Sequence, residues 1–91
     1  MNPLIIDTRE PNEYQVSHVE GALNIPPAEF MTGTVPAKLT NVDKAAPIVL
    51  YCRSGQRSNT CGMILRDFGF TNIINGTNEH HVRKLLDEQP R

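Results

Sequence analysis

The stretch IVLYCRSGQRS, residues 48–58, joins an apolar run to a polar loop that carries one cysteine. The run Ile48–Tyr51 follows Pro47 and shows no alternation of apolar and polar residues. Such a run is typical of a strand that is buried on both faces, as in a parallel sheet. The stretch therefore predicts a central strand whose end leads directly into a polar loop.

An amphipathic helix is predicted behind this loop. Its apolar positions recur at the spacing of one helical face, at Cys61, Ile64, Leu65 and Phe68. Ser58 is a favourable N-cap for this helix, and Gly69 is a favourable residue at which it ends.

The rest of the chain repeats the order of strand and helix. The expected elements are a strand at 4–6 that ends at Asp7, a short helix at 10–15, a strand at 22–25, a loop with one or two helical turns at 27–39, a strand at 72–74 turned by Asn75-Gly76, and a last helix at 78–88. This order predicts an α/β fold of βαβ units, with a small parallel sheet of about four strands and helices on both faces.

Length and composition set the class of protein. The 91 residues predict a single domain over 1–91, and nine basic against ten acidic residues give a net charge of −1. That balance argues against nucleic acid or a membrane surface as partner. The longest apolar stretch, Ile48–Cys52, is too short to span a membrane, and no secretory signal is expected in the first 25 residues. Two cysteines without a CxxC pair predict free thiols in a reducing, cytoplasmic compartment, and no zinc site.

Cys52 is the residue on which the predicted chemistry depends. It follows the central strand, and open parallel sheets bind ligands at the carboxyl ends of their strands. A helix N-terminus, Arg53 and Arg57 would each stabilise a thiolate over a thiol. Gly55 permits the positive φ that lets loop N–H groups converge on an anion. An inert buried thiol stays open as the alternative, but the two arginines favour a reactive one.

Cys61 is interpreted differently. It shares the apolar stripe of the predicted helix, so packing in the core is favoured over a role in resolving a bond to Cys52. A disulfide between the two cysteines would require the loop to fold back over the helix start, and we do not expect one.

Three stretches carry a resemblance to a known family. They are LIIDTREPNEY (4–14), HVEGALNIP (18–26) and VLYCRSGQRS (49–58). The first resembles an apolar strand followed by Asp-x-Arg and then Glu-Tyr, the second a His-Ile-x-Gly-Ala stretch with its Asn-Ile-Pro continuation, and the third an active-site loop. Together they resemble the single-domain rhodanese family, which is thiosulfate sulfurtransferase-like.

The resemblance implies a sulfurtransferase that works through a persulfide on Cys52. It implies a loop of N–H groups around that sulfur, formed by Arg53, Ser54, Gly55, Gln56, Arg57 and Ser58, and supporting roles for Asp7 and Arg9. Thiosulfate is the implied donor, and cyanide or a thiol, which could be a thioredoxin-like dithiol, is the acceptor. No metal or organic cofactor is implied.

Other function classes remain as alternatives. Related phosphatases and arsenate reductases place five residues between the cysteine and an arginine, whereas only four separate Cys52 from Arg57. This shorter loop favours binding of one sulfur atom over a tetrahedral oxyanion. A non-catalytic binding module is disfavoured because inactive relatives usually lose the cysteine, and a thiol redox protein because no CxxC pair exists.

The supporting positions have structural interpretations as well. For Arg9 a structural salt bridge, with Glu13 for instance, is favoured over a role in the site. The ring of His18 is expected to hydrogen-bond the backbone, and it is not assigned as a base.

The C-terminal part departs from the family pattern. The family commonly has Gly-Gly and then Trp where this chain has GTNEHH (76–81), and the chain contains no Trp. His80 and His81 therefore either line the mouth of the site or lie on the surface of the last helix. About four strands would leave an open sheet edge, which is compatible with a monomer or a weak homodimer.

Overall fold

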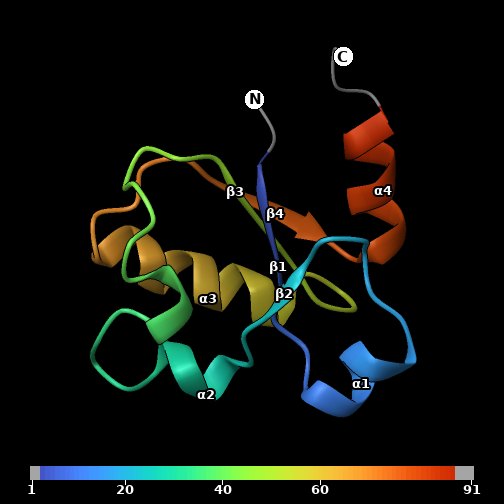
Figure 1. The fold of residues 1–91 in the computed structure, drawn as a ribbon, viewed down its shortest axis with the longest axis horizontal. Coiled ribbons are helices and arrows are strands. Elements are labelled where there is room, and N and C mark those ends of the chain that lie inside the picture. Colours follow the sequence, from blue (N-terminus) through green and yellow to red (C-terminus); the bar gives the residue numbers. More distant parts are fainter. Residues whose placement is uncertain (1–2, 88–91) are drawn as a thin grey trace.

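A computed structural model describes residues 3–87 (Figure 1). In chain order the elements are β1 (Leu4–Asp7), α1 (Pro11–Val16), β2 (Leu23–Asn24), α2 (Pro27–Phe30), the 3-10 helix η1 (Ala37–Leu39), β3 (Ile48–Tyr51), α3 (Gln56–Asp67), β4 (Ile73–Thr77) and α4 (Glu79–Asp87).

The strands of the described chain form one four-stranded parallel sheet in the order β2-β1-β3-β4. β1 and β3 are its centre, and their register pairs Asp7 with Tyr51 at the carboxyl ends. The predicted α/β fold with a small parallel sheet is therefore confirmed. The register brings the residues that follow β1 and β3 to the same edge of the sheet.

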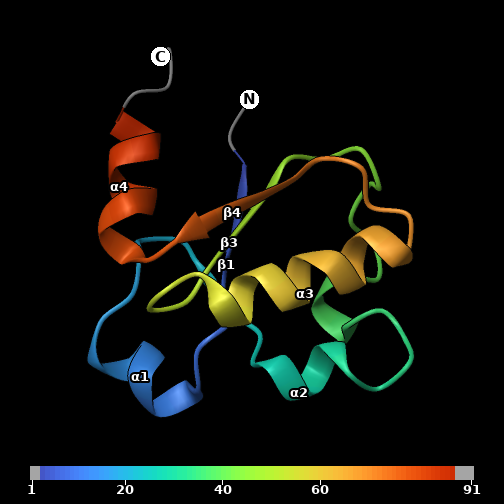
Figure 2. The same ribbon diagram turned by 180° about the vertical axis from the view of Figure 1, so that it is seen from behind.

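Helices cover both faces of the sheet, as predicted. α2 and α3 lie on one side of the strands, and α1 and α4 lie on the other (Figure 1), which the view from behind also shows (Figure 2). Alternate residues of β3 serve the two faces, because successive side chains of a strand point in opposite directions. Ile48 and Leu50 belong to the core under α3, whereas Val49 and Tyr51 pack with Val82 of α4.

The start of α3 differs from the prediction. Ser58 is not the N-cap, because the helix already begins at Gln56 after Gly55, whose φ is 91°. This left-handed conformation, which glycine adopts without strain, turns the chain into the helix three residues earlier than expected. Ser58 consequently lies in the first turn, buried and directed at the loop.

The course of β4 also differs from the prediction. Asn75-Gly76 does not form a turn, because the strand continues through both residues to Thr77. A register shift opposite Leu50 and Tyr51 accommodates this extension. A Cβ on Gly76 would lie 2.5 Å from a Val82 methyl carbon, so the glycine permits a close approach of α4. Gly76 is therefore a strand residue that lets α4 pack closely against β4, and it does not reverse the chain.

The remaining boundaries agree within two residues. α1 is shifted by one residue from the predicted 10–15, and β2 covers two of the four residues predicted at 22–25. The predicted helical turns between 27 and 39 are α2 and η1. α4 begins one residue after the predicted start, and residue 88 lies outside the described part.

Between residues 3 and 87, every helix is too short or too polar to span a lipid bilayer.

Candidate active site

Cys52 lies at the carboxyl end of β3, where the fold places the start of the loop. Its backbone N–H donates to the Thr77 carbonyl at 3.2 Å, which fixes the loop to the end of β4. The residue is only 2% exposed, although it lines a cavity at this edge of the sheet. The thiol is thus enclosed by protein on most sides and open toward the cavity.

The loop directs hydrogen-bond donors at the sulfur. The Gly55 N–H donates to Sγ at 3.1 Å, and the Ser58 hydroxyl lies 3.6 Å from it. Burial by itself raises the pKa of the Cys52 thiol, but the N–H groups of Ser58, Ser54 and Gly55 and the Ser58 hydroxyl lower it. The donors prevail, and the pKa falls to about 7. A large share of Cys52 is therefore thiolate near neutral pH.

Asn75 keeps the loop carbonyl away from the sulfur. Its side-chain N–H donates to the Gly55 carbonyl at 3.0 Å, and its Oδ1 accepts the Ser58 hydroxyl at 2.7 Å. Gly55 therefore directs its own N–H at Sγ and its own carbonyl at Asn75 of β4, through the two peptide groups that flank its Cα. Sequence reasoning missed Asn75 because Asn-Gly was interpreted as a turn. Extending the strand period through 75 would have placed Asn75 beside the loop.

Cys61 has a different environment although it is equally buried. It is 0% exposed in the apolar core with Leu50 and Leu65, as predicted. Burial raises its pKa to about 12, and the charge of Cys52 adds to this effect. Both cysteines are free thiols in the structure.

The two loop arginines have separate positions. Arg57 forms a bidentate ion pair with Glu13 of α1, at 2.8 and 3.2 Å. Its pKa is raised first by that carboxylate, against the effect of burial, and also by Cys52. Arg53 is exposed and lines the cavity, and it has no ion pair or hydrogen bond among residues 3–87. We expected both arginines to act on the sulfur and the donor; Arg57 does interact with Cys52, and Glu13 balances its charge at the same time.

Arg9 is held by acidic residues other than the one expected. Its guanidinium donates to both carboxylate oxygens of the fully buried Asp7 and lies 3.0 Å from Glu79 of α4. A salt bridge is present, but the suggested partner Glu13 is wrong. Asp7 also accepts the Tyr51 hydroxyl at 3.0 Å. Asp7 thus acts on the residue before Cys52, and no hydrogen bond of the described chain links it to residues 53–58.

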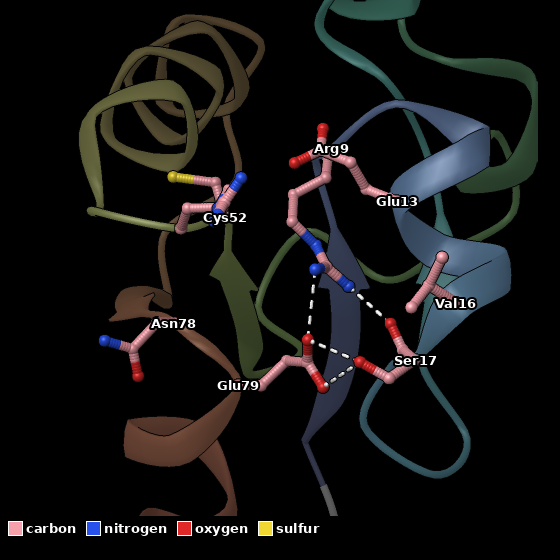
Figure 3. Close-up of a pocket in the computed structure, with 8 residues that line it drawn as sticks. Arg9, Glu13, Val16, Ser17, Cys52, Asn78 and Glu79 are labelled. Atoms are coloured by element: carbon pink, nitrogen blue, oxygen red, sulfur yellow. Dashed lines mark hydrogen bonds and ion pairs between the residues drawn. The ribbon is translucent and has the colours of Figure 1, made fainter.

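These residues surround a cavity of about 450 Å³ beside Cys52. Figure 3 shows Arg9 reaching from the end of β1 toward Glu79 and Ser17, on the opposite side of the cavity from Cys52. The lining residues are Arg9, Glu13, Val16, Ser17, Cys52, Arg53, Asn78 and Glu79. Of the two alternatives for His80 and His81, the surface of the last helix is confirmed, since both are exposed on α4, and Asn78 and Glu79 line the cavity instead.

His18 has the structural role that was predicted. Its Nδ1 lies 2.8 Å from the Tyr14 carbonyl oxygen, and its ring stacks on that of Tyr14 with centroids 3.7 Å apart. Within residues 3–87 no group of three or more His, Cys, Asp or Glu side chains is arranged to hold a metal ion.

Comparison with known proteins identifies the family. The model of the Rhodanese-like domain matches residues 1–77. The chain belongs to the rhodanese-like domain family. The match ends before Asn78 and Glu79, which are the two cavity residues contributed by the start of α4.

Similar proteins include sulfurtransferases. The chain is 37% identical over 70 residues to thiosulfate sulfurtransferase PspE of Escherichia coli, covering 77% of this chain and 64% of that protein. It is 27% identical over 79 residues to thiosulfate:glutathione sulfurtransferase of Saccharomyces cerevisiae, covering 78% and 57%. The chain thus spans less than two thirds of the length of these relatives. A solved structure described as rhodanese with anions from E. coli superposes with a TM-score of 0.75 at 33% identity, covering 88% of this chain and 91% of that one.

Proposed function

We propose that this domain is a sulfurtransferase that carries one sulfur atom on Cys52 as a persulfide. The observation that supports this most directly is the set of three N–H donors, of Ser54, Gly55 and Ser58, that act on a buried sulfur whose pKa is about 7. These donors stabilise an anion without a general base, and a persulfide is an anion whose outer sulfur extends from the same side chain.

The proposed first step loads the cysteine. The Cys52 thiolate attacks the outer sulfur of thiosulfate, a new S–S bond forms, and the bond from that sulfur to the SO₃ group breaks with its electron pair. Sulfite leaves, and Cys52 is left as a persulfide anion, so that atoms and charge balance. Exposed Arg53 would meet the anionic donor at the mouth. The solved relative described as a rhodanese with anions is consistent with such a mouth.

The proposed second step transfers the outer sulfur of the Cys52 persulfide to an acceptor. A nucleophile attacks the outer sulfur, the persulfide S–S bond breaks, and the Cys52 thiolate returns. Cyanide would yield thiocyanate, and a thiolate would yield a new persulfide. A small thiol suits a cavity of about 450 Å³, and the name of the yeast relative includes glutathione. A thioredoxin-like dithiol stays a second acceptor class.

In this proposal the loop residues 53–58 bind the persulfide, and Asp7 and Arg9 support the site through Tyr51 and the cavity wall. A reducing cytoplasmic compartment would keep both thiols free. We expect a single domain without metal or cofactor that acts as a monomer or weak dimer, with nucleic acid and membranes absent from its partners.

A phosphatase or arsenate reductase is the weaker alternative. The loop places four residues between Cys52 and Arg57, and Glu13 already occupies the guanidinium that would bind a tetrahedral oxyanion. A non-catalytic binding module would have no use for the lowered pKa of Cys52.

Intact mass after incubation with thiosulfate tests the proposal. The wild type should gain the mass of one sulfur atom and lose it when cyanide is added, with thiocyanate formed. Cys52→Ala should gain nothing, and Cys61→Ala should behave as the wild type. Turnover of a phosphoester or arsenate without any gain of sulfur would contradict the proposed function.

A further inference from the structure

The charges that line the cavity are balanced. Two guanidinium groups, of Arg9 and Arg53, face two carboxylates, of Glu13 and Glu79. Glu79 is held by Arg9 at 3.0 Å and by Arg83 at 3.0 Å, so its charge is compensated from two sides. Because the carboxylates line the same cavity as Cys52, a negatively charged donor has to approach the thiolate past them.

Glu13 is the carboxylate that couples directly to the sulfur loop. Its two oxygens bind both terminal nitrogens of Arg57, and Oε1 also accepts the Glu10 N–H at 3.0 Å. Its side chain is only 21% exposed and lines the cavity, whereas Arg57 does not line it. The hydrogen bond from Arg57, against the effect of burial, lowers the pKa of Glu13 to about 2. Glu13 therefore stays ionised under all conditions in which the protein would work.

We infer that Glu13 determines donor specificity: it holds Arg57 and places a negative charge in the cavity, and thereby selects against dianionic sulfur donors in favour of donors with less negative charge. This inference rests on the proposed sulfur transfer. Glu13 acts here by repulsion, since selection against a competing ligand is as effective as attraction of the preferred one.

Two donors that differ mainly in charge separate this effect from a general loss of activity. Thiosulfate is a dianion, and methanethiosulfonate is a monoanion in which a methyl group replaces one oxygen. The thiolate would take the outer sulfur from either, releasing sulfite or methanesulfinate. Removing one negative charge from the cavity favours the dianion twice as much as the monoanion, because the Coulomb energy scales with the charge of the donor.

Glu13→Gln tests the inference, with Glu29→Gln as matched control. Glu29 is half-buried and lines a separate depression with Thr32 and Pro36, so its substitution makes the same change in net charge elsewhere. In Glu13→Gln we expect kcat/KM to rise about tenfold for thiosulfate and about threefold for methanethiosulfonate. The ratio between the donors should return toward the wild-type value in high salt. An unchanged ratio, or an equal change in Glu29→Gln, would overturn the inference.

Alkylation of Cys52 keeps the test independent of sulfur transfer. Iodoacetate carries a negative charge and iodoacetamide is neutral, and both react with the thiolate. The rate ratio of iodoacetate to iodoacetamide should rise about threefold in Glu13→Gln and stay constant in Glu29→Gln. Failure of persulfide formation in the wild type with both thiosulfate and methanethiosulfonate would refute the proposed function, whereas a constant alkylation ratio would refute the role of Glu13. If Glu13→Gln does not fold, Glu13→Ala is used in the same two assays.

Discussion

The two cysteines of this domain lie nine positions apart, and both are buried, yet their environments give opposite chemistry. Cys52 receives the Gly55 N–H at 3.1 Å, and its pKa falls to about 7. Cys61 contacts the apolar core, and its pKa rises to about 12. Exposure does not separate them, since they are 2% and 0% exposed. The difference shows that donors aimed at a sulfur, and not its access to bulk water, decide whether it is ionised at neutral pH.

The largest expected effect is selective alkylation. At pH 8 and in native buffer, iodoacetamide should modify Cys52 at least about a thousandfold faster than Cys61, because the thiolate is the reactive form and the two pKa values differ widely. Peptide mapping after a time course measures both rates, and the rate for Cys52 should have its pH midpoint near 7. Equal labelling of both cysteines in the folded protein would contradict the claim that their environments give them different reactivity.

The second effect is that the two cysteines make the stability of the fold depend on pH in opposite directions. The Cys52 pKa is lowered from its ordinary 9.0 to about 7, so the folded state releases the proton first and stability rises from pH 7 to pH 9, by up to about 2 kcal/mol. This contribution is lost as pH falls through 7. The Cys61 pKa is raised, so above pH 9 only the unfolded state ionises and stability falls by about 1.4 kcal/mol per pH unit.

Urea unfolding of the wild type, Cys52→Ala and Cys61→Ala between pH 6 and 10 measures both slopes. The curve of Cys52→Ala should lack the rise between pH 7 and 9, and that of Cys61→Ala should lack the fall above 9. The other titrating groups are common to all three proteins and cancel in the differences. Three parallel curves would show that neither environment shifts its cysteine.

The smallest expected effect is that of Gly55→Ala, which tests whether the loop N–H activates Cys52. Gly55→Ala should cost about 1 kcal/mol of stability, because its φ of 91° is left-handed and the new Cβ meets only ordinary contacts, the nearest at 3.4 Å. The strain should also displace the N–H from Sγ and slow alkylation of Cys52 about threefold at pH 7.

Gly33→Ala is the matched control for this substitution. Gly33 has a φ of 86° and nothing within 4 Å of its Cβ position, so an alanine there carries the same backbone strain without contacting either cysteine. Both variants should lose similar stability, measured by urea unfolding, and only Gly55→Ala should change the alkylation of Cys52. If the alkylation rate of Cys52 changed in both variants, the effect would come from the general loss of stability and not from the Gly55 N–H.

Much of the fold could be predicted from the sequence because its signals are local. The run Ile48–Tyr51 is a buried strand with the predicted bounds, and Gly69 follows the last turn of α3 with a positive φ. The errors at Ser58 and at Asn75-Gly76 have a common cause. Both assignments relied on the usual local preference of a residue type, whereas contacts with distant residues decided the conformation.

The candidate site was only partly predictable. The loop cysteine, its arginines and Gly55 stand together in the sequence, so their proximity required no fold. Asn75, Glu13 and Glu79 come from three other elements, and no local pattern links them to residue 52. The ion pair between Arg57 and Glu13 spans 44 positions and changes which arginine is free to meet a donor.

The sequence by itself determined the α/β class, the strand that ends at Cys52, and the presence of a short loop with two cations before a helix. These follow from spacing within a few residues, where backbone geometry and apolar periodicity act directly. Only the tertiary structure decided which donors face the sulfur, which carboxylates compensate the arginines, and what lines the cavity. Those features depend on hydrogen bonds and ion pairs between segments that the parallel sheet brings together, and the energy of such contacts depends on distance in space and not on separation along the chain.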